Sequence, residues 1–134
     1  MVAGTLDHVG VVVRDFDATA ARYARLGLRV ASKLVLEERG VIRGYLSDGR
    51  NVVELHQPLR AETQLARFLG DRDEAQHHLC FAVDNLEAAI AALTAEGYTL
   101  APGSPWRGSR GRNAYLDSRD GRGLVLELVE KYQV

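Results

Sequence analysis

The sequence predicts an α+β fold made of two tandem βαβββ modules. The first observation is an internal repeat, because a shift of 70 residues lays His8 on His78 and Gly27 on Gly97 without a gap. The second is the order of elements, since each copy shows a strand pattern, a helix pattern and three further strand patterns. The predicted parts are module 1 at 5–58, a connector at 59–75 and module 2 at 76–130, all within a single domain at 1–134.

The first module begins with a valine-rich strand at 6–13, whose length and alternation suit a sheet with both faces covered. Asp15 is a good N-cap for a helix that runs to Leu26, and Gly27 supplies the left-handed residue that ends it. The remaining predicted strands of this module are 28–37, 41–46 and 51–56, separated by turns at 39–40 and 47–50.

The connector carries a short helical pattern in which Leu65, Phe68 and Leu69 share one face. In the second module Asn85 takes the place of Asp15 as the predicted helix cap. The predicted elements of this module are strands at 76–83, 98–101, 112–117 and 123–130, a helix at 86–96, and a loop rich in Gly and Arg at 102–111.

Composition excludes several classes of partner. A net charge of −1 lacks the basic excess that general nucleic-acid or anionic-membrane surfaces require. A single cysteine excludes an internal disulfide and fits a reducing compartment. The sequence shows neither a signal peptide pattern nor an apolar run of about 20 residues, so we expect a cytoplasmic protein with no membrane partner.

Four repeated residues carry the predicted chemistry. His8 and His78 begin equivalent strands, and Glu54 and Glu127 lie near the ends of equivalent strands. Two imidazoles and two carboxylates suit one divalent ion such as Co, Ni, Zn, Mn or Fe(II), with room for water or substrate oxygens. A lone histidine or glutamate in a strand is more often structural, but repetition in register favours a metal site. An unpaired carboxylate inside such apolar strands would also be costly.

The motifs around these residues resemble those of the vicinal oxygen chelate superfamily. The similar segments are Leu6-Asp7-His8-Val9-Gly10, Val53-Glu54-Leu55, His77-His78-Leu79 and Leu126-Glu127-Leu128-Val129-Glu130. The resemblance covers almost the whole chain and implies paired βαβββ modules whose curved mixed sheets enclose a metal cleft. It also implies that the four repeated residues are the metal ligands, as in the isomerase and lyase branches.

Within this superfamily the chain is most similar to the methylmalonyl-CoA epimerases. Glu-Leu-His-Gln-Pro-Leu at 54–59, the helical segment at 65–69 and the histidines at 77–78 follow the epimerase order and spacing. Two features depart from that pattern. Arg43 stands where several bacterial epimerases place a glutamate acid/base residue, and the segment 117–121 replaces the usual His-Pro of the last hairpin. A guanidinium is not a base at neutral pH.

We therefore expect an epimerase, isomerase or lyase that removes a proton next to a metal-chelated carbonyl. Glu127 or Glu54 is the expected base, and Arg43 is expected to hold a substrate carboxylate or phosphate unless it is a solvated strand residue. The alternatives are a small-molecule binding or antibiotic resistance protein and a tailoring enzyme of secondary metabolism. Glyoxalase I and an Fe(II) dioxygenase are further alternatives, and two glutamate ligands disfavour the latter.

Other residues are candidates for substrate contact. His56 follows Glu54 by two positions and shares its face, so it could touch substrate or belong to the rim. Tyr45 and Tyr115 occupy equivalent strand positions, where cleft lining and core packing are both open. Trp106 and the arginines of the loop at 102–111 could form a lid over an anionic substrate or a merely solvated loop. The expected partners are a small molecule, anionic or an acyl-CoA, and a second copy in a homodimer.

Overall fold

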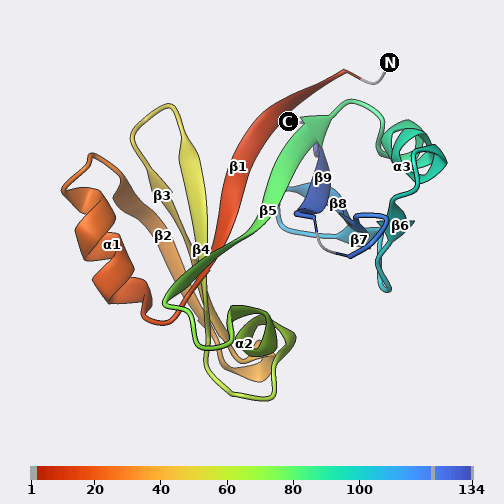
Figure 1. The fold of residues 1–134 in the computed structure, drawn as a ribbon. Coiled ribbons are helices and arrows are strands. Elements are labelled where there is room, and N and C mark those ends of the chain that lie inside the picture. Colours follow the sequence, from red (N-terminus) through yellow and green to blue (C-terminus); the bar gives the residue numbers. More distant parts are fainter. Residues whose placement is uncertain (1–2, 122, 134) are drawn as a thin grey trace. The chain divides into compact units, whose positions relative to one another are not determined.

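The computed structural model describes residues 3–121 and 123–133 and confirms an α+β chain (Figure 1). Its helices are α1 (Phe16–Ala24), α2 (Gln64–Leu69), α3 (Leu86–Ala95) and the 3-10 turn η1 (Glu37–Arg39). Its strands are β1 (Gly4–Val13), β2 (Arg29–Leu36), β3 (Val41–Ser47), β4 (Val52–Pro58), β5 (Glu74–Val83), β6 (Thr99–Leu100), β7 (Trp106–Arg107), β8 (Gly111–Asp117) and β9 (Val125–Lys131).

Contacts divide the chain into two compact units. We call residues 8–77 the N-terminal unit, and residues 1–7 together with 78–134 the C-terminal unit. Strands β1 and β5 each contribute residues to both units. That the whole chain acts as one domain with the module boundaries given above stays a prediction.

The N-terminal unit is a four-strand sheet with helix α1 against one face (Figure 1). β2, β3 and β4 run antiparallel, and β4 pairs in parallel with β1. The apolar side of α1 packs on the sheet through Val13, Phe16, Ala20, Leu46 and Leu55. Helix α2 belongs to a smaller apolar cluster, in which Leu69 packs with Val12 and Ala75. The residues of the strands that face away from α1 are therefore left to form a functional face.

The C-terminal unit has a similar arrangement around α3. β5 pairs in parallel with β9, β9 pairs antiparallel with β8, and both β6 and β7 pair with β8. Its core consists of Leu86, Ala89, Ala114, Leu116 and Leu128. As in the other unit, the helix takes the apolar side chains of one sheet face and leaves the opposite face to other residues.

The two main helices begin and end in the same way. The Asp15 side chain accepts a hydrogen bond from the Ala18 N–H, and the Asn85 side chain accepts one from the Ala88 N–H. Gly27 and Gly97 have φ values of 99° and 102°, which only glycine adopts without strain. The predicted caps are therefore confirmed at both helices.

Three local features differ from the sequence-based expectation. The predicted loop at 102–111 contains β7, because Trp106 and Arg107 pair with β8 and the Gly108 N–H donates to the Gly111 carbonyl. The turn after β2 is a 3-10 helix. Phe68 is 36% exposed and contacts the His77 ring, so it does not share the buried side of α2 with Leu69.

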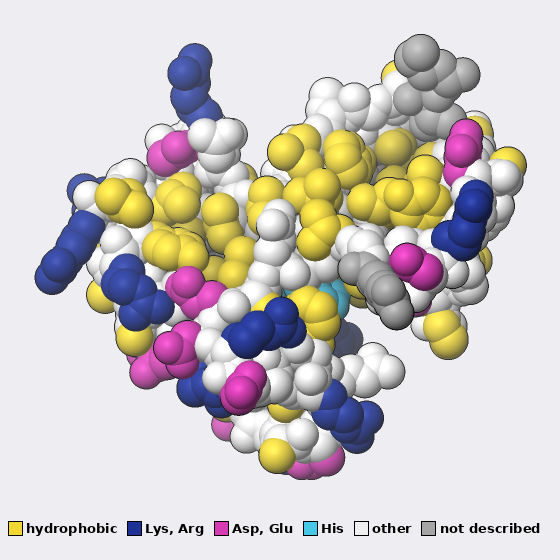
Figure 2. Space-filling view, in the orientation of Figure 1, with side chains coloured by type: hydrophobic (Ala, Val, Ile, Leu, Met, Phe, Trp, Pro, Cys, Tyr) yellow, Lys and Arg dark blue, Asp and Glu magenta, His cyan; other side chains and the backbone are white. Residues whose placement is uncertain are grey.

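The distribution of charge agrees with the composition. Figure 2 shows Lys and Arg side chains scattered among acidic ones over the visible face, without a continuous basic surface. None of the helices within residues 3–121 and 123–133 is long and apolar enough to cross a membrane.

Candidate active site

The N-terminal unit brings His8 and Glu54 together. Gly10 of β1 lies opposite Glu54 of β4, and Tyr45 of β3 lies opposite Glu54 on its other side. Because side chains alternate along a strand, His8, Glu54 and Tyr45 project from the same face of the sheet. The His8 Nε2 atom is 3.5 Å from Glu54 Oε1, and each residue is only 4% exposed.

Two further residues surround this pair. The His56 Nε2 atom lies 2.7 Å from Glu54 Oε1. The Tyr45 ring meets the His8 ring edge-on, with the ring centres 5.7 Å apart. Both residues are candidates for substrate contact, and each lies against one member of the His8–Glu54 pair.

Arg43 lies on the same face, opposite His56 in the pairing of β3 with β4. Its side chain is partly exposed, and no carboxylate among the described residues lies within ion-pairing distance of it. A guanidinium in this position is available to an anion from solution.

The C-terminal unit holds a second pair. The His78 Nε2 atom is 3.3 Å from Glu127 Oε1, and the two residues are 0% and 6% exposed. The Tyr115 ring meets the His78 ring with centres 5.8 Å apart. Trp106 in turn stacks at a tilt on Tyr115, with centres 4.9 Å apart. The aromatic candidates of this unit therefore form a continuous wall beside the histidine.

Sequence reasoning missed two residues. Asn113 lies two positions before Tyr115 on β8, and its Nδ2 group donates to Glu127 Oε2 at 3.0 Å. The alternation of the strand could have placed Asn113 on the site face. Asp7, next to His8, has a side chain only 7% exposed that pairs with both Arg110 and Lys131. These partners come from distant segments, so no local sequence pattern indicates them.

The arginines of the loop at 102–111 and its border have partners within the C-terminal unit. Arg110 makes two hydrogen bonds of 2.9 Å to the Asp7 carboxylate, and Arg107 lies over the Tyr132 ring. Arg112 donates to Glu87, which raises the pKa of the guanidinium and lowers the pKa of the Glu87 carboxyl. These contacts favour a structural loop over a lid that offers free cations to a substrate.

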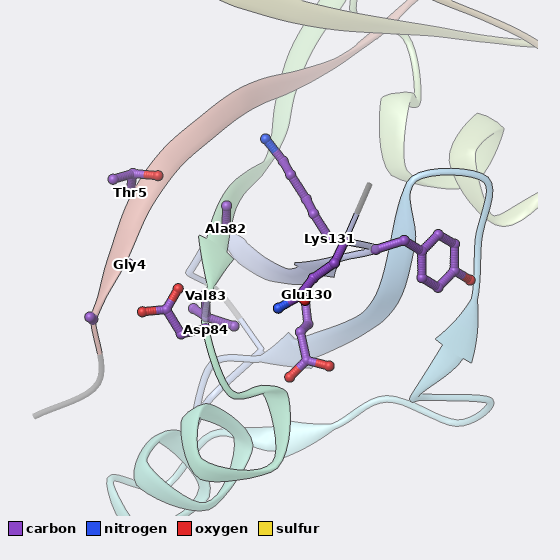
Figure 3. A pocket seen from close by; sticks show the side chains of 10 residues that line it. Gly4, Thr5, Ala82, Val83, Asp84, Glu130 and Lys131 are labelled. Carbon is purple, nitrogen blue, oxygen red and sulfur yellow. The ribbon is translucent and has the colours of Figure 1, made fainter.

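The C-terminal unit also contains a pocket of about 830 Å³ (Figure 3). It lies where the beginning of β1 approaches the ends of β5 and β9, and none of the predicted site residues lines it. Two of its charged groups have other partners, since Lys131 pairs with Asp7 and Glu130 accepts from the Leu86 N–H at the start of α3. The two His–Glu pairs are therefore the candidate site.

The donor set fits a divalent cation. In each unit a buried carboxylate lies within 3.5 Å of an imidazole nitrogen, and these residues could hold a metal. Burying a carboxylate without compensation is costly, and a cation or a protonated partner supplies that compensation. Imidazole and carboxylate are the ligands that Zn, Co, Ni, Mn and Fe(II) accept.

Known proteins support this interpretation. A family model of the Glyoxalase/Bleomycin resistance protein/Dioxygenase superfamily matches residues 7–116. The mitochondrial methylmalonyl-CoA epimerase of Homo sapiens is 31% identical over 130 residues, which cover 95% of this chain and 74% of that protein. The ethylmalonyl-CoA/methylmalonyl-CoA epimerase of Cereibacter sphaeroides is 31% identical over 131 residues, which cover 95% of this chain and 98% of that protein.

A solved structure agrees with these relatives. Methylmalonyl-CoA epimerase of Streptomyces coelicolor, in complex with 2-nitronate-propionyl-CoA, superposes with a TM-score of 0.77 and 32% sequence identity. The match covers 96% of this chain and 97% of that chain. These relatives are epimerases, and none of them is a lyase. The resemblance predicted from the strand motifs is thus confirmed, and the chain belongs to the glyoxalase/bleomycin resistance protein/dioxygenase superfamily.

Proposed function

We propose that this chain is a metal-dependent epimerase of a 2-substituted malonyl-CoA thioester, such as methylmalonyl-CoA. The observation that carries the proposal is a buried His–Glu pair in each unit of a chain whose relatives are epimerases of such thioesters. His8, Glu54, His78 and Glu127 would together hold one ion of Co, Ni, Zn, Mn or Fe(II). When bound, such an ion supplies Lewis acidity that makes the C–H next to a thioester carbonyl easier to remove.

The carboxylates would move the proton. Epimerisation needs a base that removes the proton from one face of the carbon and an acid that returns a proton to the opposite face; Glu127 or Glu54 would serve as the base, and the other carboxyl group could serve as the acid. Arg43 would not serve as the base, because its guanidinium stays protonated at neutral pH. The burial of both glutamates excludes most water, which strengthens their electrostatic interaction with a substrate.

The remaining candidates would position the substrate. Arg43 offers a planar pair of donors suited to the free carboxylate of a malonyl group or to a phosphate of CoA. Tyr45, Tyr115 and Trp106 would supply aromatic walls, and His56 would limit the space beside Glu54. If Arg43 is instead a solvated residue of the strand, its substitution will leave the KM for the substrate unchanged.

Deuterium exchange tests this proposal. Methylmalonyl-CoA is incubated in heavy water with the metal-loaded protein, and label at the carbon between the two carbonyl groups is followed by mass spectrometry. We expect rapid exchange with the wild type, a loss of at least about 100-fold in the variant that lacks the base, Glu54→Gln or Glu127→Gln, and a raised KM in Arg43→Gln. A metal-loaded protein that exchanges neither this thioester nor its ethyl analogue would contradict an epimerase. A metal-free protein with a tightly bound organic ligand would favour a binding or resistance protein.

We also propose that the protein acts as a cytoplasmic homodimer. Several large apolar side chains are about half exposed, including Leu6 at 57%, Val30 at 50% and Leu34 at 53%, and association would cover some of them. The single cysteine, Cys80, is buried, which suits a reducing compartment. Light scattering after size-exclusion chromatography should give the mass of two chains, and the mass of one chain would refute the dimer.

A further inference from the structure

We propose that His56 and Asn113 are positioning residues, each of which fixes the orientation of one site carboxylate. His56 acts on Glu54 within the N-terminal unit, and Asn113 acts on Glu127 within the C-terminal unit. The inference rests on the proposed function, because it gives these two residues a purpose in metal binding. A carboxylate that binds a metal must present one oxygen in a narrow range of directions, and hydrogen bonds to the carboxylate set that direction.

In the N-terminal unit the orienting group lies on the same strand as the carboxylate. Residues 54 and 56 of β4 project to the same face, which brings His56 Nε2 to 2.7 Å from Glu54 Oε1. An ionised Glu54 carboxylate only accepts hydrogen bonds, and in that state His56 donates to it from Nε2. The distance is typical of a charge-assisted hydrogen bond. His56 is 8% exposed, so water competes little for this contact.

In the C-terminal unit the orienting group lies on the neighbouring strand. Asn113 of β8 reaches across to Glu127 of β9 and donates from Nδ2 to Oε2 at 3.0 Å. Asparagine is unfavourable in the middle of a strand. Its Oδ1 atom is also buried without a hydrogen-bond partner among residues 3–121 and 123–133, which adds a cost. The contact with Glu127 is the compensation that the structure shows for this residue.

The two units place the hydrogen-bond donor on different strands of an equivalent pair. Beside each carboxylate lies one cross-strand pair, Arg43 with His56 in one unit and Asn113 with Val129 in the other. In the first pair the donor comes from the inner strand, which leaves Arg43 free of that task and available to a substrate anion. In the second pair the donor comes from the outer strand, and Val129 is an apolar residue only 1% exposed.

Metal affinity and the spectrum of bound Co²⁺ test the inference without turnover. The variants are His56→Leu and Asn113→Leu, which remove the donor, and His56→Gln and Asn113→Gln, which keep one. His77→Leu and Asn51→Leu serve as matched controls, since His77 contacts Phe68 and Asn51 lies in the β3–β4 hairpin. The Kd is measured by competition with a chelator, and thermal melts without metal show that each variant is folded.

We expect each leucine variant to bind Co²⁺ about 10- to 100-fold more weakly than the wild type, with changed absorption bands. The glutamine variants should recover part of the affinity, and the controls should match the wild type. Leucine variants that are folded and bind Co²⁺ with the wild-type Kd and spectrum would overturn this inference and leave the proposed function intact. A wild-type protein that binds no divalent metal would overturn both.

Discussion

Gly44 gives a prediction whose size follows from the structure. It lies on β3 between Arg43 and Tyr45, and its own side faces α1. A Cβ atom at Gly44 would be 2.2 Å from the Ser32 carbonyl oxygen and 2.7 Å from the Phe16 ring. To reach even 3.0 Å, the Ser32 backbone would have to retreat by about 0.8 Å, and contacts shorter than that are essentially never seen for real Cβ atoms.

Gly44→Ala should therefore destabilise the N-terminal unit by about 2–3 kcal/mol, the upper range for an overpacked core. The second module shows how an alanine is tolerated at the equivalent position. Ala114 packs on Leu86, a smaller side chain than Phe16, and β6 ends at Leu100, opposite Leu116, so no β6 residue pairs with Ala114. Phe16→Leu combined with Gly44→Ala should recover part of the loss, with a coupling of about 1 kcal/mol.

Urea unfolding followed by circular dichroism measures these free energies. The cycle needs the wild type, both single variants and the double variant, and Ala114→Gly serves as a reference that should cost about 1 kcal/mol. The Phe16→Leu change does not relieve the close contact with the Ser32 carbonyl oxygen. The double variant should therefore have a lower free energy of unfolding than the Phe16→Leu variant. A Gly44→Ala protein within about 0.5 kcal/mol of the wild type would refute this account of the packing.

Two other predictions concern a turn in the N-terminal unit and a helix cap in the C-terminal unit. Hydrogen bonds from the backbone N–H groups of Asn51 and Arg50 lower the pKa of Asp48 to about 2 from its usual 3.8. The stabilising effect of the ionised carboxylate should be present above pH 3.8 and decline as the pH falls through about 2, so the difference in free energy of unfolding between the wild type and Asp48→Asn, measured by urea unfolding, should shrink in acid. A difference at pH 2 as large as that at neutral pH would count against this. Asn85→Ala should cost about 1 kcal/mol through loss of the α3 cap, and a thermal melt unchanged from the wild type would exclude that role.

The sequence was sufficient for the repeated part of the molecule. The 70-residue shift predicts two helices with matching caps, and the structure shows them at Asp15 and Asn85. The repeat also predicts that His8 and Glu54 lie close together, and His8 Nε2 is 3.5 Å from Glu54 Oε1. These features follow from local periodicity and from a repeat, both of which can be read along the chain.

The parts that break the repeat could not be predicted in the same way. Asn113 corresponds to Arg43 under the 70-residue shift, so comparison of the two copies gives no sign that one orients a carboxylate and the other does not. Asp7 meets Arg110 across more than 100 positions of sequence, a contact that depends on tertiary structure. The short strand β7 forms because its partner β8 is available, while its own residues read as a loop.

The most direct test of the whole account is the metal content of purified protein measured by mass spectrometry. We predict one divalent ion per chain in the wild type, and loss of that ion both in His8→Ala, from the N-terminal unit, and in His78→Ala, from the C-terminal unit. Thermal melts without added metal should show both variants folded. Retention of a stoichiometric ion by either folded variant, or a wild type that binds none, would contradict a shared metal site.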